Sequence, residues 1–367
     1  MGIKEIRVYS VKLQYKEPFR IALGTSTESH NVIVQVITDF EIEGWGEASP
    51  SQRITGETPQ TVMEALDKIS PKLIGMCPLR IEHVVEIMDE TVSGNPSAKA
   101  AIDMALHDIL GKVAQRPLYR VIGGYRTKVL TDFTLGIKSP QEMAEAAVKA
   151  IEQGFRALKI KVGINPEEDV ERVAMVRNSV GNKVALRIDA NQGWTPEQAV
   201  NVLKKLERFD LEFVEQPVKA NDLEGLAYVR KNSTIPIMAD EAVHSPRDAL
   251  KTVEAEAVDL INIKLMKCGG ILNARKIAAI AEAAAVPCMI GCMGESGLGI
   301  TAAVHLAAAT KNIRYADLDS DLLLKDKLIE KGCAELEGSL RIPPNQPGIG
   351  IQKIFHGKLG KPIKVYR

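Results

Sequence analysis

The sequence predicts an α/β protein in which a parallel barrel of the (β/α)8 type follows a smaller α+β domain. After residue 128, eight short apolar segments recur at intervals of roughly 25 to 30 residues, the length of one βα unit. Helical patterns separate these segments, as parallel strands require. Residues 1–125 lack this rhythm. A doubly wound open sheet is the alternative, but no Gly-rich phosphate-binding fingerprint follows any of the strands.

Composition narrows the class of protein. The 367 residues are long for one compact core, which favours two domains or a barrel with an attached domain. Lys+Arg and Asp+Glu both number 47, and no basic stripe is present, so we do not expect a nucleic acid partner. We expect neither a membrane span nor a signal peptide. The five cysteines include no CxxC pair, which favours a reducing cytoplasm over a disulfide or zinc framework.

Residues 1–125 predict an α+β capping domain. The segments "IRVYSVKLQY" and "NVIVQVITDFEIEGWGEA" are typical of antiparallel strands, and the second turns back between Asp39 and Gly44. Helical patterns follow at about 58–69 and 97–112. The Gly-rich stretch "VIGGYR" then joins this domain to the next.

Residues 126–320 predict the barrel. The expected strands are "TDFTLGI", "ALKIKVG", "VALRIDAN", "EFVEQP", "PIMADEA", "DLINIKL", "PCMIGCM" and "RYADLD". Four of the helices between them open with an N-cap residue followed by proline, whose missing N–H costs nothing at the first helical position. These openings are Ser139-Pro140, Asn165-Pro166, Thr195-Pro196 and Ser245-Pro246. Residues 321–367 form a Pro/Gly-rich segment expected to return to the first domain.

Three carboxylates end three consecutive predicted strands: Asp189, Glu215 and Asp240, separated by 26 and 25 residues. Alternation along each strand points them into the barrel, and active sites form at the carboxyl ends of barrel strands. Burying three such charges without a counter-ion is strongly unfavourable, and a divalent cation resolves this. Hard oxygen ligands without neighbouring His or Cys favour Mg²⁺, or Mn²⁺. Structural ion pairs are the alternative.

Lysines lie on the strands to either side of the carboxylates. Lys159 and Lys161 share the inward face of one strand, and Lys264 lies on the strand after Asp240. By the same alternation we expect Lys267 to point outward. These strands would place Lys161 and Lys264 on opposite walls of the barrel.

A metal flanked by lysines suits removal of a proton next to a carboxylate. Removal of this proton gives an enediolate, whose charge the metal would offset. Lys159 would hold the substrate carboxylate and favour the neutral, basic form of Lys161. With Lys161 and Lys264 on opposite α-carbon faces, one removes the proton and the other returns it, which inverts the stereocentre.

The segments "KIKVG", "RIDANQGW", "VEQP", "MADEAV" and "LINIKLMKCGG" resemble the muconate lactonizing subgroup of the enolase superfamily, over essentially the whole chain. The resemblance implies a capping domain on a modified (β/α)7β barrel of the TIM type, with the C-terminal segment rejoining the cap. It also implies one Mg²⁺ per active site on Asp189, Glu215 and Asp240, with Lys161 and Lys264 as the acid/base pair.

Within this subgroup the chain is most similar to the dipeptide epimerases. The segment "YADLDS" carries Asp317 and Asp319, which the resemblance assigns to the free α-ammonium of a dipeptide. Two carboxylates opposite a metal form a reasonable cation site. The resemblance assigns further substrate contacts to Thr134, Lys159, Cys292 and Met293. A nucleophilic cysteine is the alternative at position 292, but no histidine partner is evident.

One position departs from the L-Ala-D/L-Glu epimerases, in which an arginine after "PF" meets the glutamate side chain. Gly24 occupies that place here, so a preference for acidic dipeptides is not expected. Arg53, in the loop "SQRITGET", could restore a cationic contact, and a solvated arginine is the alternative.

The expected function is Mg²⁺-dependent epimerisation of L,L-dipeptides at the C-terminal residue by two-base proton transfer. The alternatives on the same scaffold are N-acyl amino acid racemisation, o-succinylbenzoate formation and muconate-type cycloisomerisation, none of which needs an ammonium site. A non-catalytic binding or structural barrel is a further alternative. It is disfavoured because the free-energy cost of burying these charges would then serve no function. The expected partner is a small dipeptide, with no nucleic acid or membrane; a homo-oligomer is compatible with the sequence.

Overall fold

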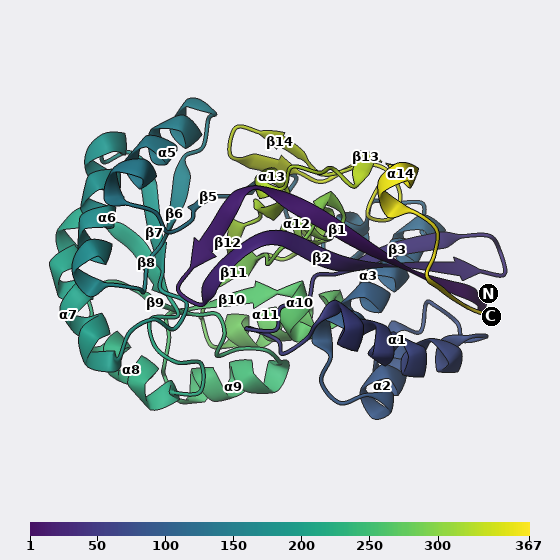
Figure 1. Cartoon of the computed structure of the whole chain (residues 1–367). Coiled ribbons are helices and arrows are strands. Elements are labelled where there is room, and N and C mark those ends of the chain that lie inside the picture. Colours follow the sequence, from purple (N-terminus) through teal and green to yellow (C-terminus); the bar gives the residue numbers. More distant parts are fainter.

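The computed structural model describes residues 1–367 and contains a parallel, nearly closed eight-stranded barrel (Figure 1). Its strands follow one another around the wall in chain order, and β12 returns to β5. At this seam the Asp132 amide donates to Ala316 O at 3.2 Å. The strands are β5 (Phe133–Leu135), β6 (Ala157–Lys161), β7 (Ala185–Asp189), β8 (Leu211–Glu215), β9 (Ile237–Ala239), β10 (Leu260–Lys264), β11 (Cys288–Gly291) and β12 (Ile313–Asp317). The predicted barrel is confirmed.

Each of the first seven strands is followed by a covering helix: α5 (Pro140–Glu152), α6 (Pro166–Val180), α7 (Pro196–Leu206), α8 (Leu223–Lys231), α9 (Pro246–Glu254), α11 (Ile271–Ala283) and α12 (Gly297–Ala309). Shorter turns are η1 (Glu207–Phe209) and α10 (Leu265–Cys268). After β12 only α13 (Ser320–Leu323) forms, so the barrel is of the (β/α)7β kind. The four predicted N-cap side chains all accept backbone amides of their helices.

The N-terminal elements are β1 (Ile3–Ile21), β2 (Gly24–Thr38), β3 (Glu43–Ala48), α1 (Pro59–Leu73), α2 (Ile81–Thr91), α3 (Pro96–Val113) and α4 (Leu118–Val121). β1 and β2 form a long antiparallel hairpin that extends from the cap over the barrel (Figure 1). The tip of this hairpin reaches the barrel mouth, because Tyr15, Phe19 and Gly24 line the same cavity as Lys161. Helix α2 was not predicted, and its N-cap residue Arg80 makes no side-chain cap bond.

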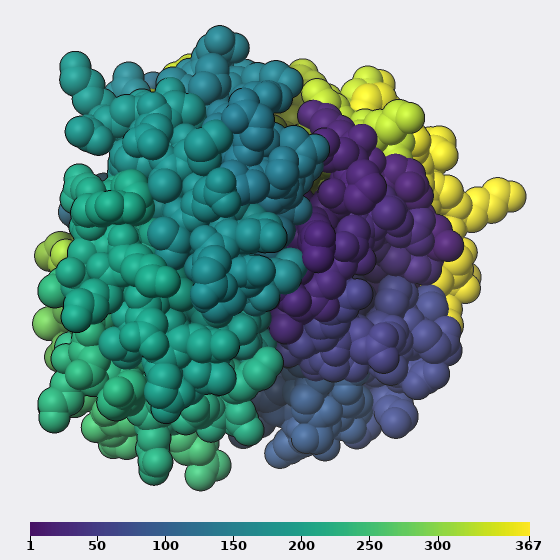
Figure 2. Space-filling view, turned by 60° about the vertical axis from the view of Figure 1, so that its left-hand side comes forward, coloured from purple at the N-terminus to yellow at the C-terminus, as the bar shows by residue number.

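The C-terminal segment runs back along the cap. Its elements are β13 (Ile329–Lys331), β14 (Glu335–Glu337), β15 (Leu340–Ile342), β16 (Lys353–Ile354), α14 (His356–Leu359) and β17 (Lys364–Tyr366). β17 pairs with β1 at the edge of the N-terminal sheet, and β15 pairs with β4 (Val129–Leu130). In Figure 2 the purple N-terminal and yellow C-terminal residues accordingly lie together beside the teal barrel. None of the helices combines the length and apolar character needed to cross a bilayer.

The hydrophobic core separates the two faces of each barrel strand. Leu158 and Ile160 of β6 belong to a cluster of 75 buried residues, whereas Lys159 and Lys161 project from the opposite face. A second cluster of 22 residues lies between the N-terminal sheet and α1, α2 and α3. The aliphatic face of β6 therefore fixes its two lysines toward the barrel interior.

Candidate active site

The three predicted carboxylates meet at the barrel mouth. Asp189 and Glu215 are paired end residues of β7 and β8, and Asp240 directly follows β9. All three are fully buried, and one ligand oxygen from each lies within 4.8 Å of the others. Parallel strands in register therefore bring together carboxylates that lie about 25 residues apart in the sequence.

The carboxylate oxygens fit a divalent cation. Glu215 Oε2 and Asp240 Oδ1 accept no hydrogen bond, although Lys159 Nζ lies 2.8 Å from the first and Lys267 Nζ 2.6 Å from the second. Burial and the neighbouring charge of Asp189 raise the pKa of Glu215 to about 8. These three side chains offer hard carboxylate oxygens, which is the donor set that Mg²⁺ takes.

Two lysines border the carboxylates from opposite walls. Lys161 Nζ donates to Asp189 Oδ2 at 2.6 Å and to Asn191 Oδ1 at 3.0 Å. Lys264 Nζ donates to Asp240 Oδ2 at 2.7 Å. β6 and β10 are four strands apart in a wall of eight, and both lysines line the cavity of about 180 Å³ at the mouth. A molecule in this cavity can therefore present a different side to each amine.

Lys159 lies deeper than Lys161 and does not line the cavity. Its Nζ lies 2.7 Å from Asp317 Oδ2, 2.8 Å from Glu215 Oε2 and 3.0 Å from Asp189 Oδ2. Burial by itself lowers the pKa of Lys159, but these carboxylates outweigh burial and raise it well above its ordinary value. Lys159 therefore stays charged and joins the three-carboxylate cluster to Asp317.

The prediction for Lys267 was wrong. This lysine is buried, with Nζ 2.6 Å from Asp240 Oδ1 and 3.1 Å from Asn262 O. The strand alternation ends at Lys264, because the chain turns directly into α10. A helical turn places the ammonium of Lys267 beside Asp240. Sequence reasoning also gave no role to Asn262, whose side chain donates to Glu215 Oε1 at 2.7 Å.

The two aspartates of the last strand face the same cavity, although Asp319 lies beyond the end of β12. Thr134 connects them: its amide donates to Asp319 Oδ2 at 2.6 Å and its hydroxyl to Asp317 Oδ1 at 3.1 Å. Burial and the charge of Asp317 raise the pKa of Asp319 to about 7. Burial acts in the same direction on Asp317, but the ammonium of Lys159 holds the pKa of Asp317 below its usual value. The pair thus carries negative charge at the cavity wall.

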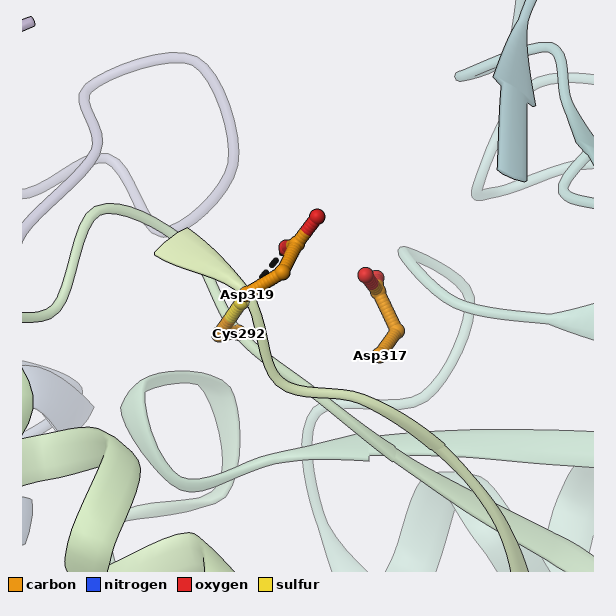
Figure 3. Close-up of side chains that lie close together, drawn as sticks. All are labelled: Cys292, Asp317 and Asp319. Atoms are coloured by element: carbon orange, nitrogen blue, oxygen red, sulfur yellow. Dashed lines mark hydrogen bonds between the residues drawn. The ribbon is translucent and has the colours of Figure 1, made fainter. Parts of the chain in front are cut away.

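Cys292 adjoins these aspartates, and Met293 lines the same cavity. Figure 3 shows Cys292 beside Asp319, with the carboxylates of Asp317 and Asp319 directed to the same side. The Cys292 thiol lies 3.8 Å from Asp319 Oδ1. Burial and the charge of Asp317 raise the pKa of the Cys292 thiol well above its usual value. A neutral thiol is a poor nucleophile, which disfavours the alternative reading of Cys292.

The loop that carries Arg53 covers Gly24. A Cβ at position 24 would lie only 2.5 Å from Cζ and Nη1 of Arg53, so the guanidinium occupies the space of the missing side chain. Gly24 has a φ of +137° and lines the cavity. An arginine head group therefore stands at this rim of the mouth, supplied by the second cap loop and not by the hairpin.

Comparison with known families agrees with this arrangement. Residues 3–123 match the family model of the mandelate racemase / muconate lactonizing enzyme N-terminal domain. Residues 142–353 match the family model described as enolase C-terminal domain-like. The chain belongs to the mandelate racemase / muconate lactonizing enzyme group of the enolase superfamily.

Solved structures show which members of this family the chain resembles over its whole length. The dipeptide epimerase of Enterococcus faecalis V583, complexed with Mg and L-Leu-L-Tyr, has a TM-score of 0.94 and 46% identity, covering 96% of this chain and 100% of its own. A substrate-liganded L-Ala-D/L-Glu epimerase from Bacillus subtilis has a TM-score of 0.95 and 42% identity, with 97% and 100% covered. An N-succinyl Arg/Lys racemase from Bacillus cereus has a TM-score of 0.96 and 36% identity over the full length of both chains. All three relatives are epimerases or racemases, so this chain is similar to isomerases throughout its length.

Proposed function

We propose that this protein is a Mg²⁺-dependent epimerase that inverts the C-terminal residue of L,L-dipeptides. The observation that carries the proposal is the pairing of two sites in one cavity. A carboxylate cluster suited to a metal lies between lysines on opposite walls, and Asp317 and Asp319 form an anionic wall that Lys159 joins to this cluster. The first arrangement suits a substrate carboxylate, and the second suits a free ammonium. A dipeptide carries both groups.

We assign the following roles to the residues of the site. Asp189, Glu215 and Asp240 would hold one Mg²⁺, which when bound supplies positive charge where the substrate carboxylate gains electron density. Lys161 and Lys264 would each face one side of the α-carbon, so that one amine removes the proton and the other donates one to the opposite side. Lys159, buried and charged, would add electrostatic attraction for the substrate carboxylate. Thr134 would hold Asp317 and Asp319 in place, and Cys292 and Met293 would complete the wall.

A free ammonium on the substrate distinguishes this function from N-acyl amino acid racemisation. The N-succinyl Arg/Lys racemase from Bacillus cereus is an example of the latter. An N-acylated substrate has no cation to offer Asp317 and Asp319, and burying both carboxylates against a neutral amide would be unfavourable. These two aspartates therefore favour the dipeptide.

We further propose that residues 1–125 cap the barrel of residues 126–320, and that residues 321–367 join the cap. We also propose that the enzyme works in a reducing cytoplasm, where its five free cysteines stay reduced.

Deuterium incorporation tests the function directly. The protein is incubated with Mg²⁺ and an L,L-dipeptide library in D₂O, and products are separated by diastereomer and weighed by mass spectrometry. We expect a gain of one dalton together with formation of the L,D product. Products that neither gain mass nor change configuration, across free and N-acylated substrates alike, would contradict both epimerase and racemase activity.

Asp319→Asn should weaken binding of free dipeptides. We expect the KM for L-Ala-L-Leu to rise by roughly tenfold to a hundredfold, since a charge-assisted contact to the ammonium is lost. Because the pKa of Asp319 is raised to about 7, the wild-type KM should increase as the pH falls below 7 and the carboxylate is protonated. The asparagine variant should lose this pH dependence. An unchanged KM with the wild-type pH profile would remove Asp319 from the ammonium site.

Arg53→Ala tests whether the guanidinium that fills the space beside Gly24 contacts the side chain of the substrate. We expect kcat/KM for L-Ala-L-Glu to fall by about threefold to tenfold relative to L-Ala-L-Leu, because an exposed guanidinium contributes a screened contact to the acidic side chain. Arg20→Ala, at an exposed arginine of the β1–β2 hairpin close to Gly24 in sequence, is the control. An equal effect of Arg53→Ala on both substrates would show that Arg53 is only solvated.

A further inference from the structure

A second cavity of about 460 Å³ lies next to the candidate site, outside the barrel wall. It is bounded by β5, α5, α13, the β14–β15 hairpin and the tip of β1, in the region between α5 and β14 in Figure 1. A complete eight-unit barrel would place a covering helix after its last strand. Here β12 is followed only by the short α13 and by hairpins, so the outer face of β5 is incompletely covered.

The cavity has an apolar interior and a charged rim. Of its 19 lining residues 11 are hydrophobic, among them Phe133, Leu135, Met143, Ala146, Phe155 and Leu336. Its charged residues include Lys138 and Glu17, which lie in the exposed part and pair with each other at 2.6 Å. Lys138 and Glu17 neutralise each other, and the third charged lining residue, Lys16, is exposed to solvent, so the interior of the cavity suits an uncharged apolar group.

This cavity shares a wall with the candidate active site. Four residues line both spaces: Tyr15, Phe19, Thr134 and Leu323. Thr134 is also the residue that donates to Asp317 and Asp319. The apolar cavity therefore begins beside the wall assigned to the substrate ammonium, and away from the carboxylate cluster.

We propose that this cavity receives a large apolar side chain from the N-terminal residue of the dipeptide. The proposal rests on the function above, because it needs the ammonium on Asp317 and Asp319. The α-carbon of that residue carries both the ammonium and the side chain, so an ammonium at this wall brings the side chain to the border with the cavity. The space of the site itself, about 180 Å³, is shared with the rest of the dipeptide, whereas the larger cavity is free to bury an aromatic ring.

Filling the cavity tests the proposal. Ala146 lies on α5, lines the cavity and does not line the candidate site. We expect Ala146→Phe to lower kcat/KM for L-Phe-L-Ala at least about tenfold more than for L-Ala-L-Ala, with the change mainly in KM. Val148→Phe adds the same ring two residues away on an exposed position of α5, and it should keep the wild-type ratio. The smaller change Ala146→Leu should shift the ratio in the same direction if the phenylalanine variant folds poorly.

The outcomes separate this inference from the proposed function. A wild-type enzyme that epimerises both dipeptides, combined with an unchanged substrate ratio in the folded Ala146 variants, would overturn the cavity assignment alone. A wild-type protein that epimerises neither dipeptide would overturn the proposed function and this inference with it. A shifted ratio in both Ala146 variants, absent from Val148→Phe, supports the assignment.

Discussion

Lys161→Met and Lys264→Met are each expected to slow epimerisation by roughly 10³-fold or more, because general acid–base catalysis is lost on one face of the α-carbon. Each variant should still exchange the α-proton with D₂O from one substrate diastereomer. The two variants should retain exchange with opposite diastereomers, L,L in one case and L,D in the other. Proton NMR of both diastereomers in D₂O measures all four rates.

We expect both variants to fold, because each carboxylate that loses its lysine partner keeps a second ammonium nearby. Lys159 Nζ lies 3.0 Å from Asp189 Oδ2, and Lys267 Nζ lies 2.6 Å from Asp240 Oδ1. Thermal unfolding and Mg²⁺ binding serve as controls for this. If both variants retained exchange with the same diastereomer, or if neither lost any, the assignment of one lysine to each face would be wrong.

Asp240→Asn is expected to remove the metal dependence together with the activity. We expect at least ~10³-fold slower epimerisation, because the charge that offsets the developing negative charge is no longer held. Wild-type activity should disappear with a chelator and return with Mg²⁺. Independently of turnover, Mg²⁺ should raise the Tm of the wild-type protein by several degrees when it binds the folded state, and it should not do so for the variant.

Asp132→Asn is the matched control for this measurement. Asp132 is also a fully buried carboxylate, but it pairs with Arg187 at 2.7 Å inside the barrel and does not belong to the three-carboxylate cluster. Arg187 keeps Glu212 as a partner at 2.7 Å. The control should lower stability and keep the Mg²⁺-dependent rise in Tm. An equal rise in Asp240→Asn would exclude Asp240 as a ligand.

The barrel was predictable because its signals are local. Each short apolar strand is followed by an N-cap residue and proline that begin a helix, as at Ser139 and Thr195, and the structure confirms both caps. Alternation along β6 also placed Lys159 and Lys161 opposite Leu158 and Ile160, as the structure has them. In a parallel sheet, strand ends share one edge, so the meeting of Asp189 with Glu215 followed from the rhythm alone.

The remaining features depend on contacts that no local pattern records. Lys267 was misplaced because β10 ends in a helical turn, which changes the direction of every later side chain. The guanidinium of Arg53 fills the space above Gly24 only because two cap loops pack together. The cavity beside β5 exists because segments from the β1 tip to β14, more than 300 residues apart, leave a gap between them.

A crystal structure with Mg²⁺ and an L,L-dipeptide is the most direct test of the central claim. The account predicts one cation on Asp189, Glu215 and Asp240, with the α-carbon of the second residue between Nζ of Lys161 and Nζ of Lys264. A complex in which both amines approach the same side of that carbon, or in which the cation binds without the three carboxylates, would contradict it.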